Sequence, residues 1–227
     1  MKNQIHPKTF AGWQLAVGLL VFAVMTVIVG ELGERIVRED QLTAVDAKLS
    51  TWLHANRSQT LTRALRIATG LGSTWWAICT ALAFGIFLIS RRQLYWLAAS
   101  WLSVFGGMLL NMQLKSVFHR ARPSFHDPVL SLTGYSFPSG HTMAATVLYT
   151  ILAAYLATHA KHGVTRALVI IAAAILIIIV GFSRIYLGAH YLSDVLGAMA
   201  EGLAWSTLCL ALFHTAQRHR AGKKKAG

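Results

Sequence analysis

Long, nearly uninterrupted apolar segments restrict the fold of this chain more than any other feature of its sequence. A helix needs roughly 20 residues to cross the ~30 Å hydrocarbon core of a bilayer. Segments of about that length recur at 11–30, 73–90, 94–117, 138–158, 166–183 and 187–213. Because lipid offers the backbone no hydrogen-bond partners, such segments must be helical. The sequence therefore predicts an all-α membrane protein with six transmembrane helices, built as a single domain over residues 1–227.

The charged residues are few, and they are distributed as in a membrane protein. Hydrophobic residues make up 55% of the chain and charged residues only 13%, which excludes an ordinary soluble domain. Much of the formal net charge of +13 comes from short runs at 91–92, 161–166 and 218–225. Such runs between apolar segments are typical of a cytoplasmic membrane face, and no basic stripe interleaved with aromatic residues indicates nucleic-acid binding. We expect no nucleic-acid partner, and we expect residues 214–227 to form a flexible, basic cytoplasmic tail.

The first apolar segment resembles a signal peptide, since Lys2 and Lys8 precede it. Its apolar run is long, and no clear cleavage site of small residues precedes Glu31. These features favour an uncleaved first membrane helix.

Residues 31–72 differ from the rest because they are rich in charge. Apolar residues recur there at helical spacing, at Leu42, Val45, Leu49 and Trp52 or Leu53. This pattern predicts one or two amphipathic helices on the outer leaflet, between the first and second spans. Two roles stay open for them: a lid or lateral gate that guides a lipid headgroup, or a helix that only covers the bundle.

Three groups of polar and ionisable residues stand at the ends of apolar segments. They are Lys115 with Arg122 and Pro123, the tetrapeptide 138–141, and Ser183 and Arg184 with His190 and Asp194. If the N-terminus is cytoplasmic, the basic runs fall on the cytoplasmic side and all three groups fall on the outer side. Ionisable residues at such positions are costly and indicate function, although side chains that snorkel to the membrane surface are the alternative.

Lys115 and Arg122 are seven residues apart, which is two helical turns. They can lie on one helix face if the third span continues that far, but Pro123 disfavours helical backbone at Arg122. A guanidinium supplies paired donors to a phosphate and an ammonium supplies a point charge. We interpret His119 and Arg120, which lie between them, as headgroup anchors.

The tetrapeptide Pro138, Ser139, Gly140 and His141 opens the fourth span. Ser136 or Ser139 can cap the helix, and proline suits its first turn. A helix N-terminus with free N–H groups is an anion site, and glycine leaves those groups approachable. His141 adds a titratable imidazole at the same place.

His190 and Asp194 are four residues apart, so on a helical last span they lie on one face within contact range. A carboxylate that holds one ring nitrogen fixes the tautomer and makes the other nitrogen more nucleophilic. Arg184, preceded by Ser183, falls on the same side of the membrane. A histidine nucleophile beside an arginine suits attack on phosphorus, although a structural pair at the membrane surface is the alternative.

The three groups together resemble the three signatures of the type 2 phosphatidic acid phosphatase superfamily. The patterns K-x6-R-P, P-S-G-H and S-R-x5-H-x3-D occur here in order and without a substitution. The resemblance covers about residues 94–213, and six spans favour the membrane branch over its soluble relatives.

This resemblance implies a metal-free phosphomonoester or diphosphate hydrolase without a cofactor. His190 would attack phosphorus to form a phosphohistidine, Asp194 would orient it, and His141 would protonate the leaving oxygen. The phosphate would be held by Lys115, Arg122, Ser139, Gly140 and Arg184. Cysteine spacing agrees with the absence of a metal, because Cys79 and Cys209 lie alone in apolar spans.

The family and the outer-face placement imply a lipid substrate, with undecaprenyl diphosphate as the first choice. Phosphatidylglycerophosphate, phosphatidic acid and lipid A phosphate are alternatives, and all imply a bacterial cytoplasmic (inner) membrane location. A small membrane transporter stays open as a different class, since ionisable residues within spans also mark carriers. Glu201, well inside the last span, is interpreted as a core carboxyl that faces Asn111 or Gln113.

Overall fold

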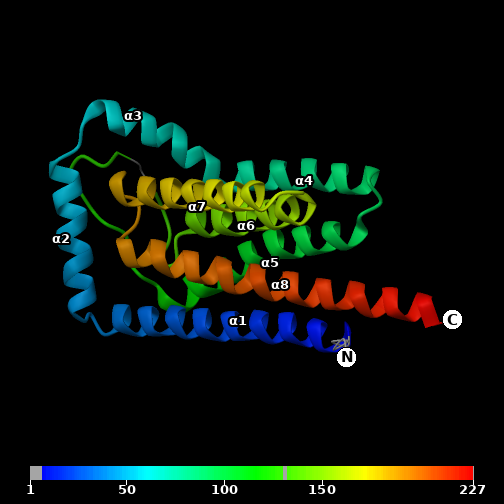
Figure 1. The fold of residues 1–227 in the computed structure, drawn as a ribbon. Helices are drawn as coiled ribbons and strands as arrows, with labels where there is room; N and C mark the ends of the chain where they lie inside the picture. The colour runs from blue at the N-terminus through cyan, green and yellow to red at the C-terminus, as the bar shows by residue number, and fades with distance from the viewer. Residues whose placement is uncertain (1–6, 130–131, 227) are drawn as a thin grey trace.

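The computed structural model describes residues 7–129 and 132–226 and places most of them in helices (Figure 1). Their bounds are α1 Pro7–Val37, α2 Gln41–Ala55, α3 Gln59–Ala68, the short 3-10 helix η1 Thr69–Gly72, α4 Thr74–Ser90, α5 Leu94–Phe118, α6 Gly140–His159, α7 Gly163–Tyr186 and α8 Leu192–Ala226. No strand occurs in these described residues. The predicted all-α fold is therefore confirmed.

Five helices are long and apolar enough to cross a membrane, over Leu15–Val37, Leu94–Phe118, Gly140–His159, Gly163–Tyr186 and Leu192–Gln217. A sixth span is present if two segments are taken as one broken span, Gln59–Gly72 and Thr74–Ser90, which meet at a bend of 46°. The apolar segment predicted at 73–90 corresponds to α4, which alone is only 17 residues long. The segment predicted as a flexible tail begins at residue 214, but α8 continues to Ala226, and the flexibility of this segment stays a prediction.

α6 is the central helix of the bundle. Of the candidate spans it is the most buried, with 61% of its apolar window inside the molecule against 11% for α1. It packs against α5, α7 and α8, while α1 lies along α8 (Figure 1). At Gly202 of α8 a Cβ atom would lie 2.8 Å from the Cβ of Thr146, so glycine lets α6 and α8 approach closely.

The first helix is longer than expected. The sequence predicted a span at 11–30 followed by a separate amphipathic segment, but α1 continues to Val37. Pairs at i,i+4 spacing support this extension, with Glu31 next to Arg35 and Glu34 next to Arg38. Ile36 is buried against the rest of the bundle, so the added turns also contribute to packing.

The predicted amphipathic helices correspond to α2 and α3. The prediction of which residues form the inner face of α2 is wrong in part. Val45 and Trp52 are 55% and 61% exposed, whereas the buried face of α2 carries Asp46, Ser50 and Leu53. The reason is that this face meets a buried arginine of the loop after α5 rather than an apolar surface. The periodicity located the helix and misassigned its inner face.

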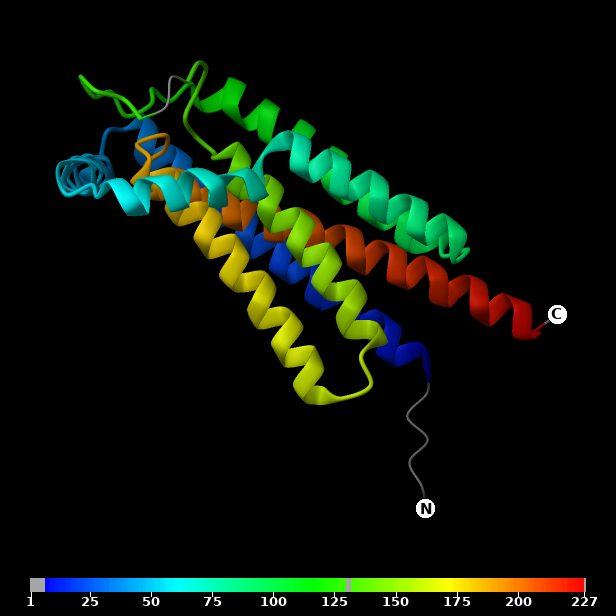
Figure 2. The ribbon, with the colours of Figure 1, turned by 90° about the horizontal axis from the view of Figure 1, so that it is seen from above.

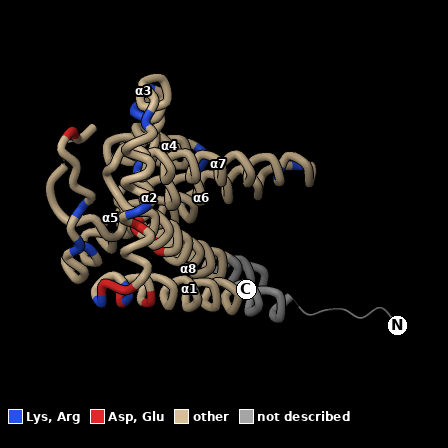
Figure 3. Tube along the Cα trace, turned by 90° about the vertical axis from the view of Figure 1, so that its left-hand side faces the viewer, with Lys and Arg blue, Asp and Glu red and all other residues tan. Residues whose placement is uncertain are grey.

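α2 crosses one end of the bundle, transverse to α1 and α8 (Figures 1 and 2). The α5–α6 loop and the α7–α8 turn lie at this end, so all three sequence motifs meet there. The α4–α5 and α6–α7 connections, with their basic residues, lie at the opposite end. Charged residues of both signs gather at the motif-bearing end (Figure 3).

Candidate active site

The first motif is divided between a helix and a loop. α5 ends at Phe118, and His119 adopts a left-handed conformation (φ 48°) that turns the chain out of the helix. Lys115 is thus in the last turn of α5, while Arg122 lies in the loop that follows. The prediction that Lys115 and Arg122 lie on one face of the same helix is therefore wrong. Pro123 had already disfavoured helical backbone at Arg122.

His190 also lies outside a helix. α7 ends at Tyr186 and α8 begins only at Leu192. The prediction that His190 and Asp194 share a helix is therefore wrong: His190 lies in the turn, and Asp194 lies in the first turn of α8. Gly188 has a φ of 71°, which only glycine adopts without strain and which reverses the chain. The amides of Ala189 and His190 both donate to the Arg184 carbonyl, at 3.0 and 3.2 Å. The turn is thereby fixed on the end of α7.

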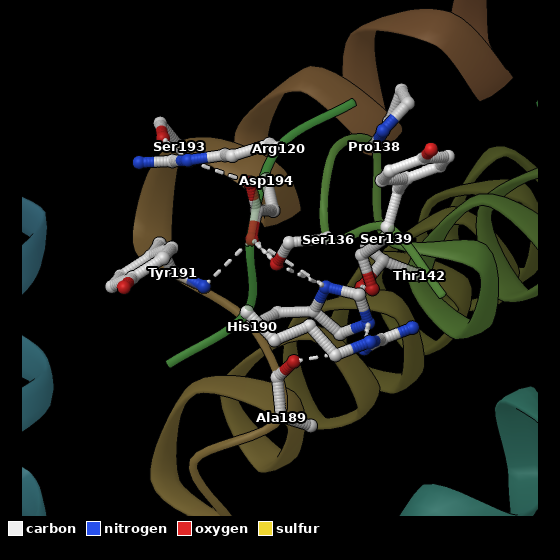
Figure 4. A network of polar contacts seen from close by, with 12 residues as sticks. Arg120, Ser136, Pro138, Ser139, Thr142, Ala189, His190, Tyr191, Ser193 and Asp194 are labelled. Carbon is white, nitrogen blue, oxygen red and sulfur yellow. Dashed lines mark hydrogen bonds and ion pairs between the residues drawn. The ribbon is translucent and has the colours of Figure 1, made fainter. Parts of the chain in front are cut away.

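His190 is 2% exposed, and its ring has polar partners on both nitrogens (Figure 4). Nη1 of Arg122 lies 3.1 Å from its Nε2. The Ser136 hydroxyl and an Asp194 carboxylate oxygen lie 3.3 and 3.5 Å from its Nδ1. A guanidinium can only donate, so Nε2 accepts and the ring proton is assigned to Nδ1. Burial lowers the pKa of His190 to about 4, against the raising effect of Asp194, so the ring is neutral near pH 7.

Asp194 is fully buried and accepts from three donors (Figure 4). They are Nη1 of Arg120 at 2.6 Å, the hydroxyl of Ser136, and the backbone N–H of Tyr191 at 2.8 Å. In the last of these bonds, the side chain of Asp194, the third residue of α8, accepts from the backbone N–H of Tyr191, which precedes the helix. This is the arrangement of a capping box. The carboxylate that faces His190 is therefore immobilised by the start of its own helix.

The headgroup-anchor interpretation of Arg120 is wrong. Its side chain is only 8% exposed, and it bridges Asp194 and Asp46, with Nη2 lying 2.8 Å from the Asp46 carboxylate. The guanidinium also donates to Ser193 at 2.7 Å and lies over the Tyr191 ring. Asp46 in turn accepts from the backbone N–H of Ser193 at 3.1 Å. α2 is thus joined to the start of α8 by a buried ionic network.

No sequence signal distinguished Arg120 or Asp46. Arg120 lies between the two residues of the first motif and beside a membrane surface, where exposed arginines are common. Asp46 lies 74 positions from Arg120 on a helix whose apolar residues indicated a different inner face. Ser136, considered as a helix cap, instead bonds to Asp194.

The predicted phosphate-binding cations converge around this histidine. The ammonium of Lys115 donates to the carbonyls of Tyr135 and Pro138 at 3.0 and 2.6 Å, which holds the loop before α6. Arg122 donates to the Ala189 carbonyl at 3.0 Å as well as to His190. Burial lowers the pKa of Arg122 from its ordinary value, but it remains a cation at neutral pH.

Arg184 carries an unsatisfied donor. Its Nη1 donates to the Thr69 hydroxyl at 2.9 Å, while its Nε is buried and has no hydrogen-bond partner. The residue is only 3% exposed. A buried charged donor without an acceptor is costly, so this nitrogen marks a place for an anion.

The second motif forms the start of α6, with small corrections. Ser139 occupies the N-cap position, but its side chain makes no capping bond; it accepts from the Thr142 hydroxyl at 3.0 Å. Pro138 precedes the helix rather than lying in its first turn. Gly140 is close to Lys115, since an added Cβ would lie 4.0 Å from the Lys115 Cε. His141 is the second residue of α6, at the same end of the bundle as Arg184 and His190.

Potential metal ligands are not grouped in the part of the chain that the structure describes: no three His, Cys, Asp or Glu side chains lie together as a possible site. The groups that face an anion here are cations and helix N–H groups instead. Independence from metals stays a prediction.

Comparison with known proteins decides the family. The sequence profile of the PAP2 superfamily matches residues 94–218, which is more than half of the chain. The chain belongs to the PAP2 superfamily. This assignment confirms the resemblance that the three motifs indicated.

Curated PAP2 relatives of this chain are bacterial proteins named as phosphatases. The chain is 36% identical over 140 residues to phosphatidylglycerophosphatase B of Bacillus subtilis, covering 60% of this chain and 66% of the relative. It is 31% identical over 172 residues to lipid A 1-phosphatase of Rhizobium etli, covering 65% of this chain and 69% of the relative. The chain thus spans about two thirds of the lengths of the curated relatives it matches.

Solved PAP2 structures share the fold. A transmembrane PAP2-type phosphatidylglycerolphosphate phosphatase from Bacillus subtilis superposes with a TM-score of 0.75 at 26% identity, covering 86% of this chain and 94% of the other. LpxE of Aquifex aeolicus superposes with a TM-score of 0.57 at 24% identity, covering 73% and 94%. The chain therefore has the fold of a multi-pass PAP2 membrane protein.

Proposed function

We propose that the protein hydrolyses a lipid phosphate or diphosphate at a membrane surface through a phosphohistidine on His190. The observation that carries this proposal is the state of the His190 ring. Its Nε2 is unprotonated and lies 3.1 Å from Arg122, while its Nδ1 side faces the buried Asp194. A neutral imidazole with one unprotonated nitrogen beside a cation is suited to attack the phosphorus of an anionic phosphate group.

In the first step, Nε2 of His190 forms a bond to phosphorus and the bond to the leaving oxygen breaks. His141 donates a proton to that oxygen, and Asp194 stabilises the positive charge that develops on the His190 ring. In the second step, water attacks phosphorus, His141 accepts a proton from it, and the bond to Nε2 breaks. Asp194 acts as a positioning residue throughout.

The equatorial phosphate oxygens are held by Lys115, Arg122 and Arg184, with the Ser139 hydroxyl and the Gly140 N–H at the start of α6. The backbone N–H of Ser139 donates instead to the Asp194 carbonyl at 3.1 Å. Phosphoryl transfer depends mainly on positioning and on neutralising these oxygens. The unsatisfied Nε of Arg184 supports this role because a phosphate oxygen would supply its missing acceptor. Three cations and a helix N-terminus can supply the charge that a metal supplies elsewhere, so we propose a reaction independent of metal ions and of cofactors.

For the substrate we propose a lipid whose tail stays in the bilayer while its phosphate reaches His190. The names of the two relatives favour phosphatidylglycerophosphate or a lipid A phosphate. Undecaprenyl diphosphate remains our proposal from the family resemblance and the expected outward-facing site. We further propose the bacterial cytoplasmic membrane as the location, with the site facing the exterior.

A small transporter is the competing function. Glu201 is its best support, because it is buried within the bundle, where Asn111 donates to it at 2.8 Å. This contact agrees with the interpretation of Glu201 as a core carboxyl facing Asn111. The other ionisable groups gather at one end of the bundle rather than midway along it, which favours an enzyme. Flux in proteoliposomes without phosphate release would favour the carrier.

Purified protein in detergent is expected to release phosphate from a panel of phosphatidylglycerophosphate, phosphatidic acid, undecaprenyl diphosphate and lipid A, with full activity in EDTA. Vanadate is expected to inhibit, since the same cations would hold it as a mimic of five-coordinate phosphorus. Phosphate release is the measurement. Loss of activity in EDTA that magnesium restores would contradict the metal-independent reaction.

Cysteine labelling is expected to place Asp127 outside the cell and Lys161 inside. The physical reason is that the short basic runs at 91–92 and 161–166 connect apolar helices at the end of the bundle that bears Lys161, as is typical of a cytoplasmic face. Single cysteines at the two positions, with Cys79 and Cys209 replaced, are treated in intact cells with a membrane-impermeant thiol reagent. Labelling at Lys161 alone would put the site in the cytoplasm and overturn the outward orientation.

Thermal stability in detergent is expected to fall between pH 6.5 and pH 4.5 because of His190. Burial lowers the pKa of its folded form to about 4, below the ordinary value of about 6.5, so the unfolded chain binds the extra proton in this interval. The contribution of His190 to stability is therefore fully present above about pH 6.5 and is lost as the pH falls towards 4. His190→Gln should flatten this part of the curve. Equal pH dependence in the two proteins would show that His190 keeps an ordinary pKa.

A further inference from the structure

A basic pocket lies beside the candidate active site and shares no residue with it. It has a volume of about 450 Å³ and lies between α3 and the α5–α6 loop. Arg57, Arg63 and Arg66 line one side, and Asp127 to Val129 line the other. Pockets of roughly 300–1,000 Å³ commonly bind small ligands, so this one is large enough for a phosphorylated headgroup.

The charges in this pocket do not balance. The Asp127 carboxylate lies 2.7 Å from Nε2 of His54 and 2.7 Å from Nη2 of Arg57. Arg66 uses one nitrogen to donate to the Val129 carbonyl at 3.0 Å. Arg63 makes no hydrogen bond or ion pair with the rest of the described chain. Three guanidinium groups and one carboxylate leave an excess of about two positive charges at neutral pH.

A series of contacts joins this pocket to His190. The ring of His54 stacks on Phe125 with centroids 3.9 Å apart and planes inclined by 10°. Phe125 packs on Gly188, where an added Cβ would lie 3.0 Å from its ring. Gly188 begins the turn that carries His190, and the loop that carries Phe125 also carries Arg122. The pocket is thus connected to the turn of the candidate nucleophile through two stacked rings, His54 and Phe125.

The pocket also lies at headgroup depth. α3 is followed by Trp75 and Trp76 at the start of α4, and these side chains are 76% and 44% exposed. Exposed tryptophans next to an apolar span are typical of the membrane–water interface. A lipid whose terminal phosphate reaches His190 therefore presents the rest of its headgroup at the level of α3.

We propose that Arg57, Arg63 and Arg66 form a second anion subsite that binds another phosphate group of a lipid headgroup while the phosphate to be cleaved lies at His190. Arginines bind phosphate oxygens through paired N–H donors, and two excess positive charges are enough to neutralise the single charge of a phosphodiester or the charge of a phosphate monoester. This inference rests on the proposed function. The second phosphate belongs either to the substrate molecule itself or to a neighbouring anionic phospholipid.

The test compares Arg63→Gln/Arg66→Gln with the control Arg38→Gln/Lys48→Gln, which removes the same charge at the same end of the bundle but outside the pocket. Two lipids with identical acyl chains are used in nonionic detergent: phosphatidylglycerophosphate, which has a phosphodiester besides its terminal phosphate, and phosphatidic acid, which has none. Both are then repeated in nanodiscs with and without phosphatidylglycerol.

If the substrate supplies the second phosphate, the pocket variant should raise KM for phosphatidylglycerophosphate about tenfold in detergent, with kcat unchanged and phosphatidic acid unaffected. If a neighbouring lipid supplies it, KM for phosphatidic acid should rise only in nanodiscs that contain phosphatidylglycerol. Kinetics equal to those of the control under every condition would overturn the subsite.

A binding measurement separates this inference from the proposed function. In a His190→Ala background, micelles of dihexanoyl-phosphatidylglycerol should raise the melting temperature, and the pocket variant should lose this increase while the control keeps it. That result supports the subsite even if no lipid of the panel is hydrolysed. No increase in the parent, or an equal increase in the pocket variant, overturns it.

Discussion

His190→Ala is expected to abolish phosphate release while the protein remains folded in detergent. The substitution removes the unprotonated Nε2 that Arg122 contacts, and no second nucleophile is predicted at the site. The loss should be at least about a thousandfold in kcat, which corresponds to roughly 4 kcal/mol of activation free energy. Phosphate release from the best lipid of the panel, followed by acid-labile labelling of the protein, measures both the rate and the intermediate.

His126→Ala is the matched control, since it removes an exposed histidine at the same end of the bundle. It should keep nearly full activity. Asp194→Asn should cost less than His190→Ala, because the imidazole remains although its tautomer is no longer fixed. A His190→Ala protein with more than a tenth of the original activity would refute the nucleophile assignment.

Arg120→Ala is expected to lower both the stability and the activity of the protein. Its effect on stability is the largest that we predict. It leaves Asp46 and Asp194, which are 1% and 0% exposed, without their shared cation. Removing one partner of a buried ion pair typically costs about 3–5 kcal/mol, because the remaining charge is neither hydrated nor neutralised. Melting in detergent measures the stability, and phosphate release from the folded fraction measures the activity.

Arg38→Ala serves as the control, because Arg38 pairs with Glu34 at an exposed position where an ion pair contributes little. Arg120→Lys should restore part of the stability, since it keeps a charge but cannot reach both carboxylates with a planar fork. If Arg120→Ala melts within a degree or two of the parent protein, the buried network does not hold α2 and α8 together.

The sequence alone determined the membrane class, the helical fold and the family, and it predicted most residues of the candidate site. Apolar segments of bilayer length can only be helical in lipid, so the helical fold follows from the bilayer environment rather than from the packing of the helices. The motif residues were identifiable because ionisable groups at the ends of apolar segments are costly and therefore rare. The sequence also predicted that the three motifs lie at one end of the bundle, because basic runs and motifs alternate between successive spans along the chain.

Only the tertiary structure decided how these residues meet. The sequence placed His190 and Asp194 on one helix, yet a glycine turn carries His190 and the start of α8 holds Asp194. It treated Arg120 as a surface anchor, and the buried face of α2 was assigned to apolar residues. The carboxylate of Asp46 is buried because Arg120, 74 positions away, neutralises it. Local periodicity indicates which residues share a helix face. A charge, however, can be buried only beside a partner that neutralises it. Where that partner comes from a distant segment of the chain, only the tertiary structure brings the two together.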